Sequence, residues 1–149
     1  MNRFLLFLWK NLPFSKNIKL LLMRLLQDEF LIAVTGIIFN NDSQVLLFKH
    51  SYRETPWALP AGYLKQKEHP REGLEREIFE ESGYSVKIDR TLKTRTDRET
   101  ARLEICYVGK YYGGIFKKSD EVSDAKFFSV DNLPLLPKDQ LLLIHKALN

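Results

Sequence analysis

Cysteine is nearly absent from this 149-residue sequence, in which Cys106 is the single example. One cysteine cannot form a disulfide within the chain, and we expect Cys106 to be a buried strand residue. No stretch approaches the ~20 consecutive apolar residues of a membrane-spanning helix. The net charge of +4 is also small. Charge alone therefore gives no strong signal for a nucleic-acid partner.

The first 29 residues differ from the rest of the chain. Residues 4–9 form an apolar run that is shorter than the apolar core of a signal peptide, and no small-residue cleavage site follows it. Residues 15–27 place leucine and isoleucine at helical spacing, with basic residues among them. We expect a helical N-terminal extension, residues 1–29, that packs on the remaining domain or on a second subunit of a homodimer. Attachment to a membrane surface is the less favoured alternative.

Residues 30–149 have the size and the apolar content of one domain with its own core. Apolar, β-branched runs separated by turn residues predict strands, and helical spacing of apolar residues predicts helices. The expected strands cover residues 30–39, 44–49, 57–59, 86–96, 102–112 and 125–129, and the expected helices cover residues 70–82 and 138–148. Residues 60–62 are expected to form a turn. This order predicts an α/β (α+β) fold with one mixed sheet and helices packed against it.

The boundaries of the first helix are well marked. Pro70 suits the first helical position, where its missing N–H has no cost, and Gly83 suits the left-handed position just after the helix. Leu74 and Ile78 are expected on the inner side. Glu72 and Glu75 are expected to be solvated helix surface.

Three further acidic residues share one face of this helix. Glu77, Glu80 and Glu81 lie at i, i+3 and i+4, and carboxylates at that spacing repel one another. A hard cation would relieve the repulsion, and oxygen ligands suit Mg²⁺, Mn²⁺ or Ca²⁺. The spacing therefore predicts a cation site beside the helix.

The whole segment from Gly62 to Tyr84 resembles the Nudix box. The box has nine defined positions in 23 residues, and the sequence matches each of them with Gly62, Glu68, Arg76, Glu77, Ile78, Glu80, Glu81, Gly83 and Tyr84. The resemblance extends over residues 31–136. The one departure is Ala61, where relatives often carry a second glycine, and it affects only the fine geometry of the loop.

The resemblance implies a Nudix-type α/β/α sandwich and a hydrolase that depends on Mg²⁺ or Mn²⁺. The implied reaction cleaves the diphosphate of a nucleoside diphosphate linked to another group, such as ADP-ribose or a nucleotide sugar. Carried over position by position, Glu77, Glu80 and Glu81 would bind the metal, and Glu68 would be an outer ligand. Gly62 would supply a backbone carbonyl or only the turn. Arg76 would hold the carboxylates in place by an ion pair.

Residues outside the box complete the predicted site. In relatives a later loop often supplies a further acid as base or ligand, and here we favour Glu121 over Asp120. Tyr52 is a candidate for stacking on a base, and Arg53 is a candidate for contacting a phosphate.

The sequence leaves two alternatives to this reaction open. One is a nucleoside triphosphate pyrophosphatase, and the other is a domain that senses nucleotides without cleaving them. Removal of a cap from RNA is compatible with the charge but has no motif in its favour. The expected partner is a small nucleotide, and the expected location is the cytoplasm.

Overall fold

The computed structural model describes residues 15–19, 30–51 and 54–149. The chain divides into two compact units, Met1–Phe30 and Leu31–Asn149. In the first unit, residues 16–19 are helical. The rest of the predicted extension lies outside the described residues, so its role and the exact domain limits stay predictions. Among the described residues, no helix is long and apolar enough to cross a bilayer.

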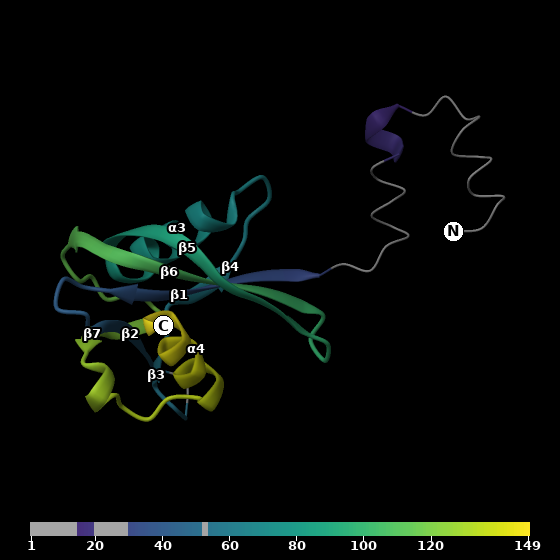
Figure 1. Cartoon of the computed structure of the whole chain (residues 1–149). Coiled ribbons are helices and arrows are strands. Elements are labelled where there is room, and N and C mark those ends of the chain that lie inside the picture. Colours follow the sequence, from purple (N-terminus) through teal and green to yellow (C-terminus); the bar gives the residue numbers. More distant parts are fainter. Residues whose placement is uncertain (1–14, 20–29, 52–53) are drawn as a thin grey trace. The chain divides into compact units, whose positions relative to one another are not determined.

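The second unit is built on a seven-stranded mixed sheet (Figure 1). Its strands are β1 (Leu31–Phe39), β2 (Val45–His50), β3 (Trp57–Ala58), β4 (Ala61–Tyr63), β5 (Tyr84–Asp97), β6 (Arg102–Gly114) and β7 (Val122–Phe128). The main path runs β3-β2-β1-β6-β5, while β4 pairs with β1 and β7 pairs with β2. Among the strand pairings of the described residues, only that of β1 with β6 is parallel. The mixed sheet confirms the predicted fold class.

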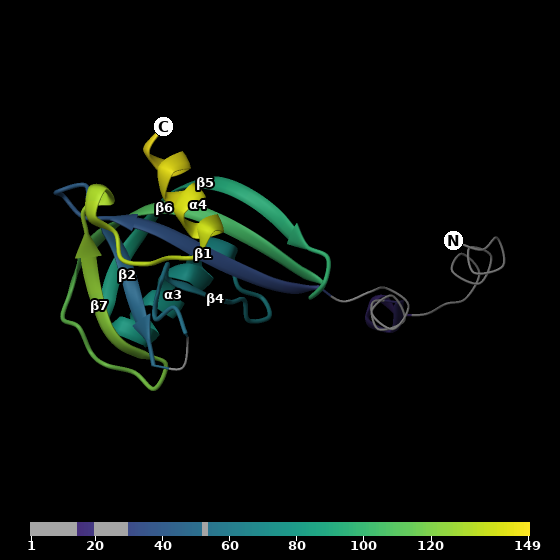
Figure 2. The same cartoon turned by 90° about the horizontal axis from the view of Figure 1, so that it is seen from below.

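Helices cover both sides of this sheet (Figures 1 and 2). They are α3 (Pro70–Ser82) and α4 (Lys138–Leu148), and a short 3-10 turn, η1 (Val130–Asn132), precedes α4. Residues alternate between the two faces of a strand, so each central strand feeds two cores. Strand β2 is apolar at consecutive positions because both of its faces are buried.

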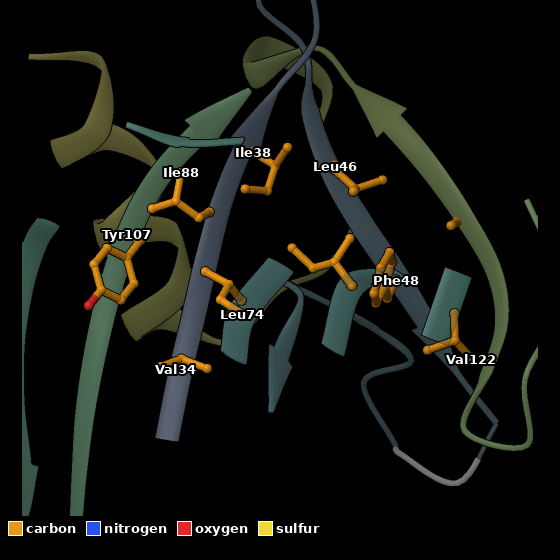
Figure 3. Packing of buried hydrophobic residues seen from close by; sticks show 10 residues of the cluster. Val34, Ile38, Leu46, Phe48, Leu74, Ile88, Tyr107 and Val122 are labelled. Carbon is orange, nitrogen blue, oxygen red and sulfur yellow. The ribbon is translucent and has the colours of Figure 1, made fainter. Parts of the chain in front are cut away.

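Each face of the sheet has its own core. Leu74 and Ile78 of α3 pack with β1, β2 and β6 (Figure 3). Leu143 and Ile144 of α4 pack in the second cluster, which also contains Cys106. Cys106 is fully buried, as predicted. The two helices are thereby fixed against opposite faces of the sheet.

Strand β4 was not predicted, because residues 60–62 read as a turn. It pairs antiparallel with β1, with Val34 opposite Gly62 and Thr35 opposite Ala61. A pairing partner almost thirty residues away is invisible to local turn patterns, and tertiary pairing overrides local preference. This strand brings the beginning of the box against the edge of β1.

The ends of α3 agree with their predicted signals. Pro70 occupies the first turn, and Gly83 adopts φ 73° at the C-terminal end. The prediction that Glu72 and Glu75 lie on the solvated surface holds for Glu72, which is exposed, whereas Glu75 is partly buried. Glu72 forms a capping box with His69 at the start of the helix, and Glu75 Oε1 accepts a hydrogen bond of 2.9 Å from the Ile88 amide. Both acids thus accept hydrogen bonds from backbone N–H groups, one at the start of α3 and one in the bulged strand β5, where such donors need acceptors.

Candidate active site

A cavity of about 300 Å³ lies where β1, β4, α3 and β6 meet. Carboxylates from three separate parts of the chain reach it. It is lined by Ala33, Thr35, Ala61, Gly62, Tyr63, Glu77, Glu81, Arg102, Glu104 and Glu121. The cavity therefore joins residues from both halves of the box to residues that lie well outside it.

Gly62 allows α3 and β4 to approach closely. A Cβ atom on Gly62 would lie 2.5 Å from Glu77 Cδ and 3.0 Å from Glu77 Cβ. Real Cβ atoms essentially never approach another heavy atom closer than 3.0 Å. The glycine is thus required for packing, because the Glu77 side chain occupies the space that any other residue would fill.

Arg76 is the electrostatic centre of the box. Its Nε donates to Glu68 Oε1 at 2.6 Å, and its Nη2 donates to Glu68 Oε2 at 3.0 Å. Its Nη1 lies 2.9 Å from Glu77 Oε1 and 2.8 Å from Glu80 Oε2. The forked contact with Glu68 is the bidentate geometry in which guanidinium and carboxylate bind most strongly. One arginine therefore holds three of the acidic side chains together.

These contacts shift the acid–base properties of the group. The hydrogen bonds from Arg76 lower the pKa of Glu68 to about 2, and the same guanidinium lowers the pKa of Glu80. Pairing with Glu68 in turn raises the pKa of Arg76. An opposite charge within hydrogen-bond distance favours the charged form of each partner. Glu68, Glu80 and Arg76 therefore stay ionised across the physiological range.

The predicted residues do not all meet at one point. Gly62, Glu77, Glu81 and Glu121 line the cavity. Glu68 is not among the lining residues; it pairs with Arg76 and lies close to Gly73, whose added Cβ would be 2.9 Å from Glu68 Oε2.

Glu80 borders a second, more open hollow. This hollow of about 770 Å³ also contains Asp120. Of the two acids considered in the late loop, Glu121 is thus the one in the cavity with Glu77 and Glu81, which favours it over Asp120.

The donor set suits a hard divalent cation, since carboxylate oxygens and a backbone carbonyl are the ligands such ions take. Within residues 15–19, 30–51 and 54–149, however, no three His, Cys, Asp or Glu side chains are arranged so that they could hold a metal ion. Arg76 instead supplies the positive charge that Glu68, Glu77 and Glu80 share. The residue types therefore fit a metal ion, but in this structure the carboxylates are paired with Arg76.

Sequence reasoning missed a second polar group in the cavity. Glu104 is buried, accepts a hydrogen bond of 2.5 Å from Thr35 Oγ1 and forms an ion pair with Arg95. Arg95 also contacts Asp139 Oδ2, in the first turn of α4, at 2.8 Å. Pairing with Glu104 raises the pKa of Arg95. The only signal in the sequence was a glutamate in an otherwise apolar stretch of β6. Tyr52 and Arg53 lie outside the described residues.

Comparisons with known proteins identify the family of this chain. The sequence model of the NUDIX domain matches residues 29–146. The chain is 33% identical over 121 residues to an ADP-ribose pyrophosphatase of Methanocaldococcus jannaschii, covering 76% of this chain and 70% of that protein.

Solved structures show the same fold. An ADP-ribose pyrophosphatase from Streptococcus suis superposes with a TM-score of 0.68 at 24% identity, covering 80% of this chain and 92% of that one. The NUDIX domain of Shewanella oneidensis NrtR complexed with ADP ribose gives 0.68 at 21% identity, covering 90% and 97%. The box is complete, and the family model matches most of the length of this chain. This chain therefore belongs to the Nudix family and is a Nudix hydrolase.

Proposed function

We propose that the enzyme hydrolyses the diphosphate linkage of a nucleoside diphosphate joined to a second group, with ADP-ribose as the first candidate. The products are a nucleoside monophosphate and the phosphorylated second group. The observation that carries the proposal is the cavity in which Glu77, Glu81 and Glu121 meet beside Gly62. The relative from Methanocaldococcus jannaschii, named as an ADP-ribose pyrophosphatase, supports this choice of substrate.

The proposed reaction is the attack of water on one phosphorus of the diphosphate. A bond forms between the water oxygen and that phosphorus, the bond from phosphorus to the bridging oxygen breaks, and the bridging oxygen leaves on the other phosphate. A bound divalent cation, which we propose to be Mg²⁺ or Mn²⁺, neutralises phosphate charge and acidifies water. Glu77, Glu80 and Glu81 would hold it, with Glu68 and the Gly62 carbonyl as further donors.

An acidic side chain of the enzyme accepts the proton that the attacking water loses. We assign Glu121 as the base that accepts the proton of the attacking water, because it is the late-loop acid in the cavity. Arg76 positions the carboxylates by its ion pairs with Glu68, Glu77 and Glu80. Tyr52 and Arg53 stay predictions as contacts for base and phosphate.

The test is phosphate release, coupled to a phosphatase, from a panel of ADP-ribose, nucleotide sugars, CDP-alcohols, dinucleoside polyphosphates and nucleoside triphosphates. It is run with Mg²⁺, with Mn²⁺ and with a chelator. Glu80→Gln, Glu81→Gln and Glu121→Gln are compared with Glu99→Gln, which changes an exposed acid in the β5–β6 turn in the same way. We expect the first three to lose at least about 100-fold in kcat, since general base and metal-ligand groups contribute that much.

The proposed chemistry fails if no member of the panel is cleaved with either metal, or if the box variants keep the rate of Glu99→Gln. Preferential cleavage of nucleoside triphosphates would instead identify a triphosphate pyrophosphatase. Tight binding of ADP-ribose without turnover would identify a nucleotide-sensing module.

A further inference from the structure

Strand β6 presents a basic and an acidic residue to the same cavity. Arg102 and Glu104 are two positions apart, so their side chains leave the same face of the strand. Both line the cavity that also contains Glu77 and Glu81. The parallel pairing of β6 with β1 places Ala33 beside Glu104, and Thr35 follows two positions later on the same face. The Nudix box contributes neither Arg102 nor Glu104.

Glu104 has unused capacity to accept hydrogen bonds. Its relative exposure is only 8%, and its two oxygens accept from Thr35 and Arg95. A carboxylate offers about four acceptor positions, so capacity remains beyond these two donors. The flanking contacts hold the carboxylate in one orientation, and an ionised carboxylate only accepts. Such a group selects ligand groups that carry N–H or O–H.

Arg102 has the opposite character. Its Nη2 lies 3.5 Å from Asp97 Oδ2, while its Nε is buried without a hydrogen-bond partner among the described residues. A buried donor that lacks an acceptor costs free energy, and such an exception calls for an explanation. Arg102 also lines the cavity, so its guanidinium can donate to an anionic oxygen of a ligand bound there.

We propose that Arg102 and Glu104 together select the nucleotide end of the substrate. Arg102 donates to a phosphate oxygen, and Glu104 accepts a hydrogen bond from a donor of the nucleoside, either the exocyclic amine of the base or the ribose 2′-hydroxyl. This inference rests on the proposed function and adds the residues that determine its specificity. Both residues act in binding, and neither transfers a proton in the reaction.

Binding is measured by calorimetry with a chelator present, so that it does not depend on turnover. The ligands are AMP, IMP, which carries a carbonyl in place of the adenine amine, and 2′-deoxy-AMP, which lacks a ribose hydroxyl. The proteins are wild type, Glu104→Gln, Arg102→Lys and the matched control Glu99→Gln. Kinetics with ADP-ribose and thermal unfolding are measured on the same four proteins.

We expect Glu104→Gln and Arg102→Lys each to weaken AMP binding and to raise KM about tenfold, the effect of losing one hydrogen bond to a charged group, with kcat changed less than about threefold. Glu99→Gln should match wild type. Wild type should bind one of the two analogues about tenfold more weakly than AMP, and Glu104→Gln should bind that analogue and AMP equally. The weaker analogue identifies the donor that Glu104 contacts.

The inference is overturned if wild type binds AMP, IMP and 2′-deoxy-AMP equally, an arm that needs no variant to fold. It is also overturned if Glu104→Gln lowers the melting temperature but leaves the Kd of AMP unchanged, because Glu104 would then only tie β6 to Arg95. Failure of the proposed function would give a different result from failure of this inference. In that case no diphosphate is hydrolysed, while wild type still discriminates among the three nucleotides.

Discussion

The contact between Gly62 and Glu77 predicts a large effect from the smallest change of side chain, Gly62→Ala. The added methyl would lie 2.5 Å from Glu77 Cδ, whereas ordinary contacts begin at 3.4 Å. Rotation of the carboxylate alone does not remove the overlap, because Glu77 Cβ, fixed to α3, is also only 3.0 Å away. Either α3 or β4 must shift by about 1 Å to restore ordinary contacts.

The magnitude follows from that shift. Overpacking costs about 1–3 kcal/mol, of which about 0.4–1 kcal/mol is recovered because alanine restricts the unfolded chain. The melting temperature should therefore fall by a few degrees. The loss of activity should be larger, about 100-fold in kcat/KM, because a displacement near 1 Å of a catalytic group has an effect of that order.

The assay combines thermal unfolding with hydrolysis of the best substrate in the panel. Gly36→Ala is the matched control, since its added Cβ meets Leu74 Cδ2 at 3.2 Å, in the apolar core rather than beside a carboxylate. It should lose some stability and keep kcat/KM within about threefold of wild type. If Gly62→Ala retains wild-type kcat/KM, the inference that Glu77 must occupy this position is refuted.

The ion pairs and helix ends give three further predictions. The lowered pKa of Glu68, about 2 against an ordinary 4.5, means that its pairing with Arg76 stabilises the fold above about pH 4.5 and that this contribution is lost toward pH 2. In urea unfolding with a chelator present, Arg76→Ala should therefore lose less stability than wild type between about pH 5 and pH 3. An equal change of stability with pH in both proteins would contradict the pairing of Glu68 with Arg76. Arg95→Leu should cost about 3 kcal/mol in the same assay because it leaves Glu104 buried without its ion pair, and a loss below about 1 kcal/mol would count against that pairing. Gly83→Ala should cost about 1–2 kcal/mol, since φ is 73° there; an unchanged urea midpoint would show that the end of α3 rearranges freely.

The helix of the box was predictable because its signals are local. Pro70 and Gly83 mark its ends, and the apolar spacing of Leu74 and Ile78 identifies its inner face. The acidic spacing and the match to the family pattern likewise involve residues within one short segment. Physical preferences that act within a few positions can be read from sequence directly.

The rest of the cavity depends on contacts between distant residues. The sequence predicts no role for Glu104, which the pairing of β6 with β1 places beside Thr35. It predicts a solvated Glu75, whereas the bulged strand β5 brings the Ile88 amide to this side chain. The local sequence does not identify the partner in either contact, because that partner lies 13 positions away in one case and 69 in the other.

The parallel pairing of β1 with β6 also bears on how the enzyme acquires its activity. Parallel neighbours cannot be joined by a tight turn, and here the whole box is inserted between them. Contacts of such sequence separation form late, after the cost of closing a long loop has been met. During synthesis, the helix with its arginine and glutamates can form well before the opposite wall of the cavity exists. A nascent or truncated chain that ends before Arg102 would thus carry the complete Nudix box but lack Arg102, Glu104 and Glu121, which line the opposite wall of the cavity.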